Sequence, residues 1–162
     1  YVKLNRYDAI RSEFLLDNYM TPQTCNTTCT DDSREDDDTY SQARVTTVPT
    51  HTSTGNVTCP NDDDFYKVRL FDGDVLTIAL TFTQSNSTQD LDLHLYKGFT
   101  DLWPCSPTNP SSCTSAHGQG AVSNEHAVHT QTTGCAAGCD YYVVVRGYDG
   151  SQNNYGITIK VE

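Results

Sequence analysis

Hydrophobic and polar residues alternate most clearly from Asp62 to Tyr96, a stretch that predicts three consecutive strands. In the middle strand the apolar side chains share one face: Leu76, Ile78, Leu80 and Phe82. The last strand has an apolar and a polar face, formed by Leu91, Leu93 and Leu95 on one side and Asp90, Asp92, His94 and Tyr96 on the other. A period of two is expected of strands that are buried on one face. The first two strands are separated by a predicted tight turn at Asp72–Asp74.

The flanking segments predict further strands and loops. Residues 141–162 alternate on both sides of a turn at 149–154, which predicts a closing hairpin. The threonine-rich residues 45–61 are interpreted as a polar hairpin connection, and residues 97–122, rich in proline and serine, as a long loop. Residues 1–24 form an arm with one apolar side, which either packs on its own domain or docks on a neighbouring subunit.

Several motifs along the chain resemble, in order, those of the bacterial pre-peptidase C-terminal (PPC) domain family. The resemblance covers residues 33–162 and lies in the order of the motifs, since none is specific alone. The matching segments are Glu35–Tyr40 with Ala43, Asp62–Tyr66, Phe71–Asp74, Asp90–Tyr96, Ser123–Glu125, and Tyr141–Tyr148 with Tyr155. The resemblance implies one PPC-like domain over residues 25–162, preceded by the arm at 1–24. Its fold would be an all-β, antiparallel, jelly-roll-like sandwich of about 8–9 strands.

Composition agrees with a turn-rich β protein. The 162 residues are 36% hydrophobic and only 19% charged, and a chain of this length is long enough for one domain with a substantial core. The net charge of −11 argues against binding to nucleic acid or to an anionic membrane surface. Acidic surfaces favour divalent cations and basic partners instead. No apolar run is long enough to span a bilayer, and the initial Tyr1 leaves room for a signal segment that was removed.

Seven cysteines indicate disulfides and therefore an oxidising, extracellular or cell-surface location. They are Cys25, Cys29, Cys59, Cys105, Cys113, Cys135 and Cys139. Bridges 105–113 and 135–139 are feasible, zinc binding is disfavoured by the spacings, and an odd count leaves one cysteine unpaired, modified or linked to another chain. Three N-x-S/T sequons, at Asn26, Asn56 and Asn86, predict glycosylation.

The acidic run after Asp31 allows two interpretations. A solvated acidic loop is the usual one. A calcium site is the other, because Ca²⁺ takes six to eight oxygen ligands from flexible loops. The PPC resemblance places such a site at two family segments, the opening acidic segment and the Asp-rich strand start. In this chain the implied ligands are Glu35, Asp37, Asp38, Asp62 and Asp64.

Two functions remain after a search for catalytic motifs, which finds neither a nucleophile elbow nor a phosphate-binding loop. The first is a non-catalytic, extracellular structural subunit, disulfide-bonded and glycosylated, that assembles with itself into filaments through its N-terminal arm. The second is a calcium-stabilised module that binds polysaccharide or collagen-like protein and accompanies a secreted hydrolase. Trp103 and Phe99 are the candidate binding residues, although Trp103 could equally plug one end of the sandwich.

Overall fold

In the computed structural model of this chain, residues 29–102 and 123–162 are described, and they form two β-sheets. Sheet A has the order β1-β3-β8-β5-β6 and contains β1 (Arg44–Val45), β3 (Asp64–Leu70), β8 (Cys139–Gly147), β5 (Leu91–Lys97) and β6 (Thr100–Asp101). Sheet B has the order β2-β9-β4-β7 and contains β2 (Thr50–Thr58), β9 (Asn153–Val161), β4 (Val75–Phe82) and β7 (Glu125–Thr130). Among these residues only the short β1 pairs in parallel, and no helix is long and apolar enough to cross a membrane.

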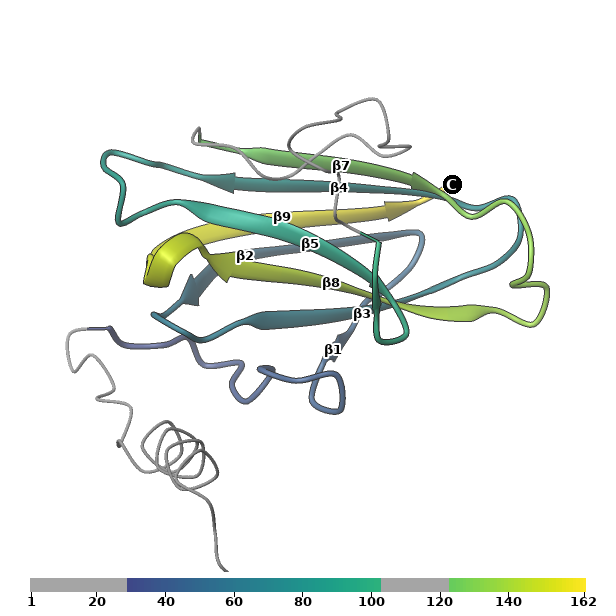
Figure 1. Cartoon of the computed structure of the whole chain (residues 1–162), viewed down its shortest axis with the longest axis horizontal. Coiled ribbons are helices and arrows are strands. Elements are labelled where there is room, and N and C mark those ends of the chain that lie inside the picture. The colour runs from purple at the N-terminus through teal and green to yellow at the C-terminus, as the bar shows by residue number, and fades with distance from the viewer. Residues whose placement is uncertain (1–28, 103–122) are drawn as a thin grey trace, which may run out of the picture.

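The chain runs as a jelly roll, because successive strands alternate between the two layers. From β2 onward the chain passes to sheet A at β3, returns at β4, and crosses again at β5, β7, β8 and β9 (Figure 1). The predicted all-β sandwich, its jelly-roll character and its strand number are therefore confirmed.

The core lies between the sheets and is built from the alternating apolar positions that the sequence predicts. Leu91, Leu93 and Leu95 of β5 are at most 1% exposed, as are Leu76, Ile78 and Leu80 of β4. Ile157 and Ile159 of β9, with Val143 and Val145 of β8, fill the space between them. Each such side chain contributes about 1.5–3 kcal/mol when fully buried, so this contact between layers holds the sandwich together.

The predicted closing hairpin over residues 141–162 is wrong in its pairing, and the turn at Asp72–Asp74 also joins strands of different sheets. β3 and β4 flank the turn at Asp72–Asp74 but belong to different sheets, and so do β8 and β9 on either side of residues 148–152. Neither pair therefore shares a ladder. Residues 50–58, predicted to be a loop, form β2, because their outward threonines suit the solvent face of a sheet. A period of two identifies a strand and its buried face but not its partner.

Two disulfides are present among the described cysteines. Cys29 is bonded to Cys59, and Cys135 to Cys139. The second bridge was predicted as feasible, whereas the first was not foreseen. Both fit an extracellular protein. The predicted disulfide cysteines Cys25, Cys105 and Cys113 lie outside the described residues, as does the arm at 1–24.

Candidate functional site

The acidic residues meet at one end of the sandwich because three contacts hold the segment after Cys29 against β2 and β3. The Cys29–Cys59 disulfide fixes the start of the segment to the end of β2. Farther along, the amide of Phe65 donates to the carbonyl oxygen of Asp37 at 3.0 Å. The ring of Tyr40 then packs edge-on against Phe65, with 5.0 Å between centroids. The segment therefore lies beside the first residues of β3.

All five predicted metal ligands lie in this region, which we name the acidic cluster and define as Asp31, Glu35, Asp36, Asp37, Asp38, Asp62 and Asp64. Carboxylate oxygens of Glu35, Asp37 and Asp64 lie within 4.8 Å of one another. Oxygens of Glu35, Asp36 and Asp38 form a second group with the same spacing, and Asp31 and Asp62 approach each other beside Cys59. Cys59 offers no thiolate, because its sulfur is in a disulfide.

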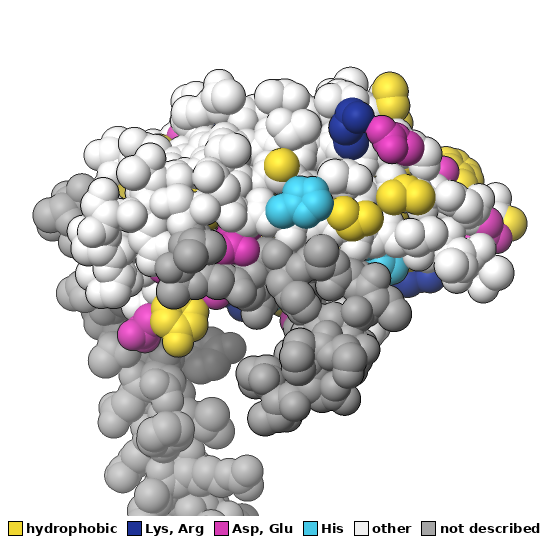
Figure 2. Space-filling view, turned by 90° about the horizontal axis from the view of Figure 1, so that it is seen from above, with side chains coloured by type: hydrophobic (Ala, Val, Ile, Leu, Met, Phe, Trp, Pro, Cys, Tyr) yellow, Lys and Arg dark blue, Asp and Glu magenta, His cyan; other side chains and the backbone are white. Residues whose placement is uncertain are grey.

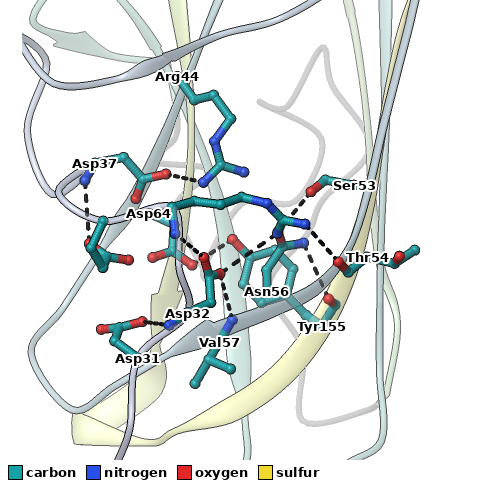
Figure 3. Close-up of polar contacts among 12 residues, drawn as sticks. Asp31, Asp32, Asp37, Arg44, Ser53, Thr54, Asn56, Val57, Asp64 and Tyr155 are labelled. Carbon is teal, nitrogen blue, oxygen red and sulfur yellow. Dashed lines mark hydrogen bonds and ion pairs between the residues drawn. The ribbon is translucent and has the colours of Figure 1, made fainter.

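Two of these carboxylates are buried and incompletely paired. Asp37 and Asp64 are each only 2% exposed. One oxygen of Asp37 accepts from Arg44 Nη2 at 2.6 Å, while its Oδ1 has no hydrogen-bond partner. One oxygen of Asp64 accepts from the Tyr155 hydroxyl at 2.5 Å (Figure 3). The same oxygen accepts from Thr58 Oγ1 at 2.9 Å, and Oδ1 of Asp64 also lacks a partner. Buried unpaired oxygens of this kind are rare and costly in folded proteins.

The carboxylates of the cluster have too few positive charges beside them, and their pKa values are raised. Burial raises the pKa of Asp64 to about 7, although the hydrogen bonds from Tyr155 and Thr58 act to lower it. Burial also raises the pKa of Asp37 to about 6, although Arg44 opposes the shift. Burial and the neighbouring carboxyls raise the pKa of Glu35 to about 8 and that of Asp62 to about 9. At neutral pH the cluster therefore repels itself unless protons or a cation enter it.

The residues offer the kind of ligands that a hard cation such as calcium takes. Two oxygens bound to one Ca²⁺ at 2.3–2.6 Å lie at most about 5 Å apart, which matches the spacing of Glu35, Asp37 and Asp64. The donors are all oxygens, and no histidine belongs to any of the carboxylate groups among the described residues. The unpartnered Oδ1 atoms of Asp37 and Asp64 are the positions that a bound cation would satisfy.

Sequence reasoning missed five participants in this site: Asp31, Asp36, Arg44, Thr58 and Tyr155. Asp31 has a signal in the sequence, since it follows Cys29 by two residues and would be placed beside Asp62 once the Cys29–Cys59 pair is known. Tyr155 has none, because it reaches Asp64 from β9 across 91 residues of sequence. Its hydroxyl also bonds the Tyr66 hydroxyl at 2.8 Å, deep between the sheets.

Asn56, one of the three predicted glycosylation sites, is buried in the structure. This side chain is 0% exposed, and its Nδ2, the atom to which a glycan would be attached, donates to the Tyr155 carbonyl oxygen at 3.2 Å. Its Oδ1 accepts from Ser53 Oγ at 2.8 Å and from Arg34. A sugar on this nitrogen would have no room in the fold. The threonine of this sequon, Thr58, is equally buried beneath the acidic cluster.

The other predicted binding and glycosylation residues have different outcomes. Asn86 is exposed in the loop between β4 and β5, where its Oδ1 accepts from the amide and hydroxyl of Thr88. Phe99 is 82% exposed, and its ring packs against Tyr40 with 4.9 Å between centroids. Asn26 and Trp103 lie outside the described residues. The cluster of Phe99 with Trp103 therefore stays a prediction.

Comparisons with known proteins give matches in structure alone. No family profile matches the sequence, and no curated protein does. Among solved structures, the pre-peptidase C-terminal domain of a collagenase from Bacillus anthracis matches with a TM-score of 0.44 and 13% identity, over 74% of this chain and 96% of that chain. PliG of Salmonella Typhimurium, a periplasmic inhibitor of g-type lysozyme, matches with a TM-score of 0.45 and 15% identity, over 74% of this chain and 99% of that chain. PliG of Aeromonas hydrophila gives 0.43 and 12%, over 74% of this chain and 99% of that chain. The first of these is a domain of the family that the sequence motifs resemble.

Proposed function

We propose that this chain is a non-catalytic, extracellular structural protein whose sandwich is stabilised by Ca²⁺ bound at the acidic cluster. The observation that carries the proposal is the pair of buried, unpartnered oxygens on Asp37 and Asp64. Arg44 is the only cation paired with these two carboxylates in the described part of the chain. One arginine leaves most of the cluster's charge uncompensated, and a divalent cation compensates it.

A calcium titration tests this directly. The ion binds the folded state and not the unfolded chain, so millimolar Ca²⁺ should raise the melting temperature, and EGTA should reverse the rise. The informative variant is Asp64→Asn. Its amide oxygen keeps the acceptor for Thr58 and Tyr155, while its nitrogen replaces the unpartnered Oδ1 and can donate to the neighbouring carboxylates. We expect this variant to be at least as stable as the wild type in EGTA and to lose the response to calcium.

Asp92→Asn is the matched control. Asp92 lies half-buried on the outer face of β5, and burial raises the pKa of its carboxyl to about 6, but it belongs to none of the carboxylate groups of the acidic cluster. This variant should keep the full calcium response. A wild-type melting temperature that is indifferent to calcium at millimolar concentration would refute the metal part of the proposal.

Assembly with further copies through the N-terminal arm is the second part of the proposed function. The observation that favours it is the outer edge of β7, which has no strand partner among the described residues. The opposite edge of sheet B is different, since Asp32 accepts from the Val57 amide of β2 and Arg34 donates to the Thr54 carbonyl. An unpaired edge is a template for an added strand. The arm at residues 1–24 supplies an apolar segment of suitable length.

Electron microscopy of the native chain, with and without EGTA, tests the assembly. We expect filaments from the full chain and dispersed particles after deletion of residues 1–20. Val128→Lys should also prevent assembly, because a charge on an edge strand opposes the addition of another strand. Thr77→Lys is its control, since Thr77 lies opposite Val128 on the central strand β4 and leaves the edge unchanged. Assembly that survives the deletion would refute this route.

A further inference from the structure

A second concave surface lies on the outer face of sheet B, away from the carboxylates. It is a hollow of about 680 Å³ where β2, β4 and the start of β9 lie side by side. We name it the uncharged groove and define it by its lining: Thr54, Gly55, Thr81, Phe82, Thr83, Asn124, Asn153, Asn154, Tyr155 and Gly156. Its volume falls within the range of about 300–1,000 Å³ that is usual for ligand sites.

The groove exists because two features of the strands remove side chains from its floor. The pairing of β2 with β9 shifts between Ser53 and Asn56, and this bulge contains Gly55 at a φ of 70°. Gly156 occupies an outward position on β9 directly opposite Thr81 of β4. A Cβ at Gly156 would approach Thr81 Oγ1 to 2.9 Å, so the floor at this point is bare backbone.

The lining carries no charge, although the chain has a net charge of −11. It offers amides, hydroxyls and backbone groups. Figure 2 views the molecule from the side on which β7 and β4 lie, and most of the described surface seen there is uncharged polar side chain and backbone, with few acidic or basic side chains. No side chain of the lining supplies a counter-ion for a charged ligand, whereas a ligand with many neutral hydroxyls would find both donors and acceptors there.

Several of these polar groups are already held in place. Thr81 Oγ1 donates to the Gly156 carbonyl at 3.2 Å, and Asn124 Oδ1 accepts from the Phe82 amide at 3.2 Å. Asn153 Nδ2 donates to the carbonyls of Thr83 and Gln89, each at 2.9 Å. In the described structure the amide nitrogen of Asn124 and the side chains of Asn154 and Thr54 make no hydrogen bond, which leaves them available at the rim. Groups that are fixed before binding lose little entropy when a ligand arrives.

From this geometry we infer that the uncharged groove binds a neutral oligosaccharide. Sugar hydroxyls both donate and accept, as do the amide and hydroxyl groups of the rim. The two aromatic residues of the lining, Phe82 and Tyr155, are only 7% and 4% exposed, so the groove offers little apolar surface for the side chains of a peptide. The same scarcity of stacking surface predicts weak binding, with a Kd on the order of 1 mM. The inference is independent of calcium, because no carboxylate lines the groove.

Backbone NMR of the isotope-labelled full chain tests it. The probes are hexasaccharides of glucose, mannose and N-acetylglucosamine, each up to 10 mM, with hexagalacturonate as the charged sugar and a collagen-like Gly-Pro-Pro peptide as the neutral polypeptide. We expect saturable chemical-shift changes of the groove amides with at least one neutral sugar. We expect none with hexagalacturonate or with the collagen-like peptide. The inference would be overturned if none of the neutral sugars shifted the groove amides. It would also be overturned if the peptide or the acidic sugar shifted them equally.

Two variants localise the binding. Asn124→Asp keeps the acceptor for the Phe82 amide and replaces the rim donor with a negatively charged oxygen. Asn154→Ala removes an exposed side chain that has no partner in the described structure. Each should weaken the neutral sugar about fivefold or more, whereas Thr132→Ala, an exposed threonine beyond β7, should leave the Kd unchanged. Unchanged affinity in both groove variants, with their calcium response intact, would overturn the groove and leave the proposed calcium site untouched.

Discussion

The acidic cluster and the uncharged groove lie on either side of the same β-bulge, yet their chemistry is opposite. The cluster forms where a disulfide and a few hydrogen bonds hold a loop segment against β2 and β3, and it gathers five carboxylates of that segment with Asp62 and Asp64. The groove comes from the strands themselves, through a bulge and a glycine, and its lining has no charge. The charged site is therefore built where an irregular segment meets the start of β3, whereas the groove is built by strands of sheet B.

Asn56 and Tyr155 join the two regions. Asn56 closes the bulge by bonding Ser53 and the Tyr155 backbone, and it accepts from Arg34 of the acidic segment. Tyr155 lines the groove, and its hydroxyl donates to Asp64. Variants at the cluster, at the groove and at this junction should therefore separate the two regions.

Loss of the Cys29–Cys59 disulfide should have the largest effect. Replacing both cysteines with serine frees a loop of about 30 residues, which lowers the free energy of unfolding by about 3–4 kcal/mol in the chain-entropy model. Urea denaturation measures the loss. The calcium response should fall with it, because Asp31 is no longer fixed beside Asp62, whereas the groove shifts produced by sugar should persist in the folded fraction. A double variant with an intact calcium response would show that the loop holds its place without the bridge.

Asn56→Ala should come next, at about 2–3 kcal/mol. The substitution leaves the Tyr155 carbonyl, the Ser53 hydroxyl and Arg34 without their buried partner. Because this residue joins the two regions, both calcium affinity and sugar affinity should decline, as measured by thermal shift and NMR. Asn86→Ala is the control, since this exposed side chain bonds only within its own loop. An effect of Asn56→Ala on one region alone would disprove the coupling.

The effect of pH on stability should be smaller than the effects of these substitutions. It should also have the opposite sign to ordinary acid denaturation, because without calcium the fold loses stability as the pH rises. The folded-state pKa values of Asp37 and Asp64 are raised to about 6 and 7, above the ordinary 3.8, so the folded protein holds more protons than the unfolded chain between about pH 4 and 7. The contribution of these two carboxyls to stability without calcium is therefore largest below about pH 4 and is lost as the pH rises through their folded-state pKa values, by about 2 kcal/mol once solvent screening is allowed for. Calcium competes with those protons and should flatten the profile. Melting curves from pH 5 to 8 in EGTA and in calcium measure both slopes, and Asp64→Asn should reduce the slope seen in EGTA.

Some of this structure could be predicted from the sequence, and the reasons differ between regions. The alternation at Leu91, Leu93 and Leu95 identified a strand and its buried face, because burial imposes a period of two. The same pattern could not show that β3 and β4 lie in different sheets, since pairing depends on contacts distant in sequence. The predicted metal ligands lie close together because the two acidic segments follow the two cysteines of one disulfide. The pairing of those two cysteines could not be predicted from a sequence with seven cysteines. The groove could not be predicted from the sequence, because threonine and asparagine in strands form no motif that indicates a binding site.

The smallest effect on stability should come from glycosylation, and burial distinguishes the two sequons that lie within the described residues. Mass spectrometry of glycopeptides from native material should find Asn86 occupied and Asn56 bare, because only Asn86 has an exposed side chain. Asn86→Gln should remove the glycan and change the free energy of unfolding by less than about 0.5 kcal/mol. A glycan on Asn56 would be incompatible with the hydrogen bond from its side-chain amide to the Tyr155 carbonyl. The bulge between the acidic cluster and the groove would then have to open.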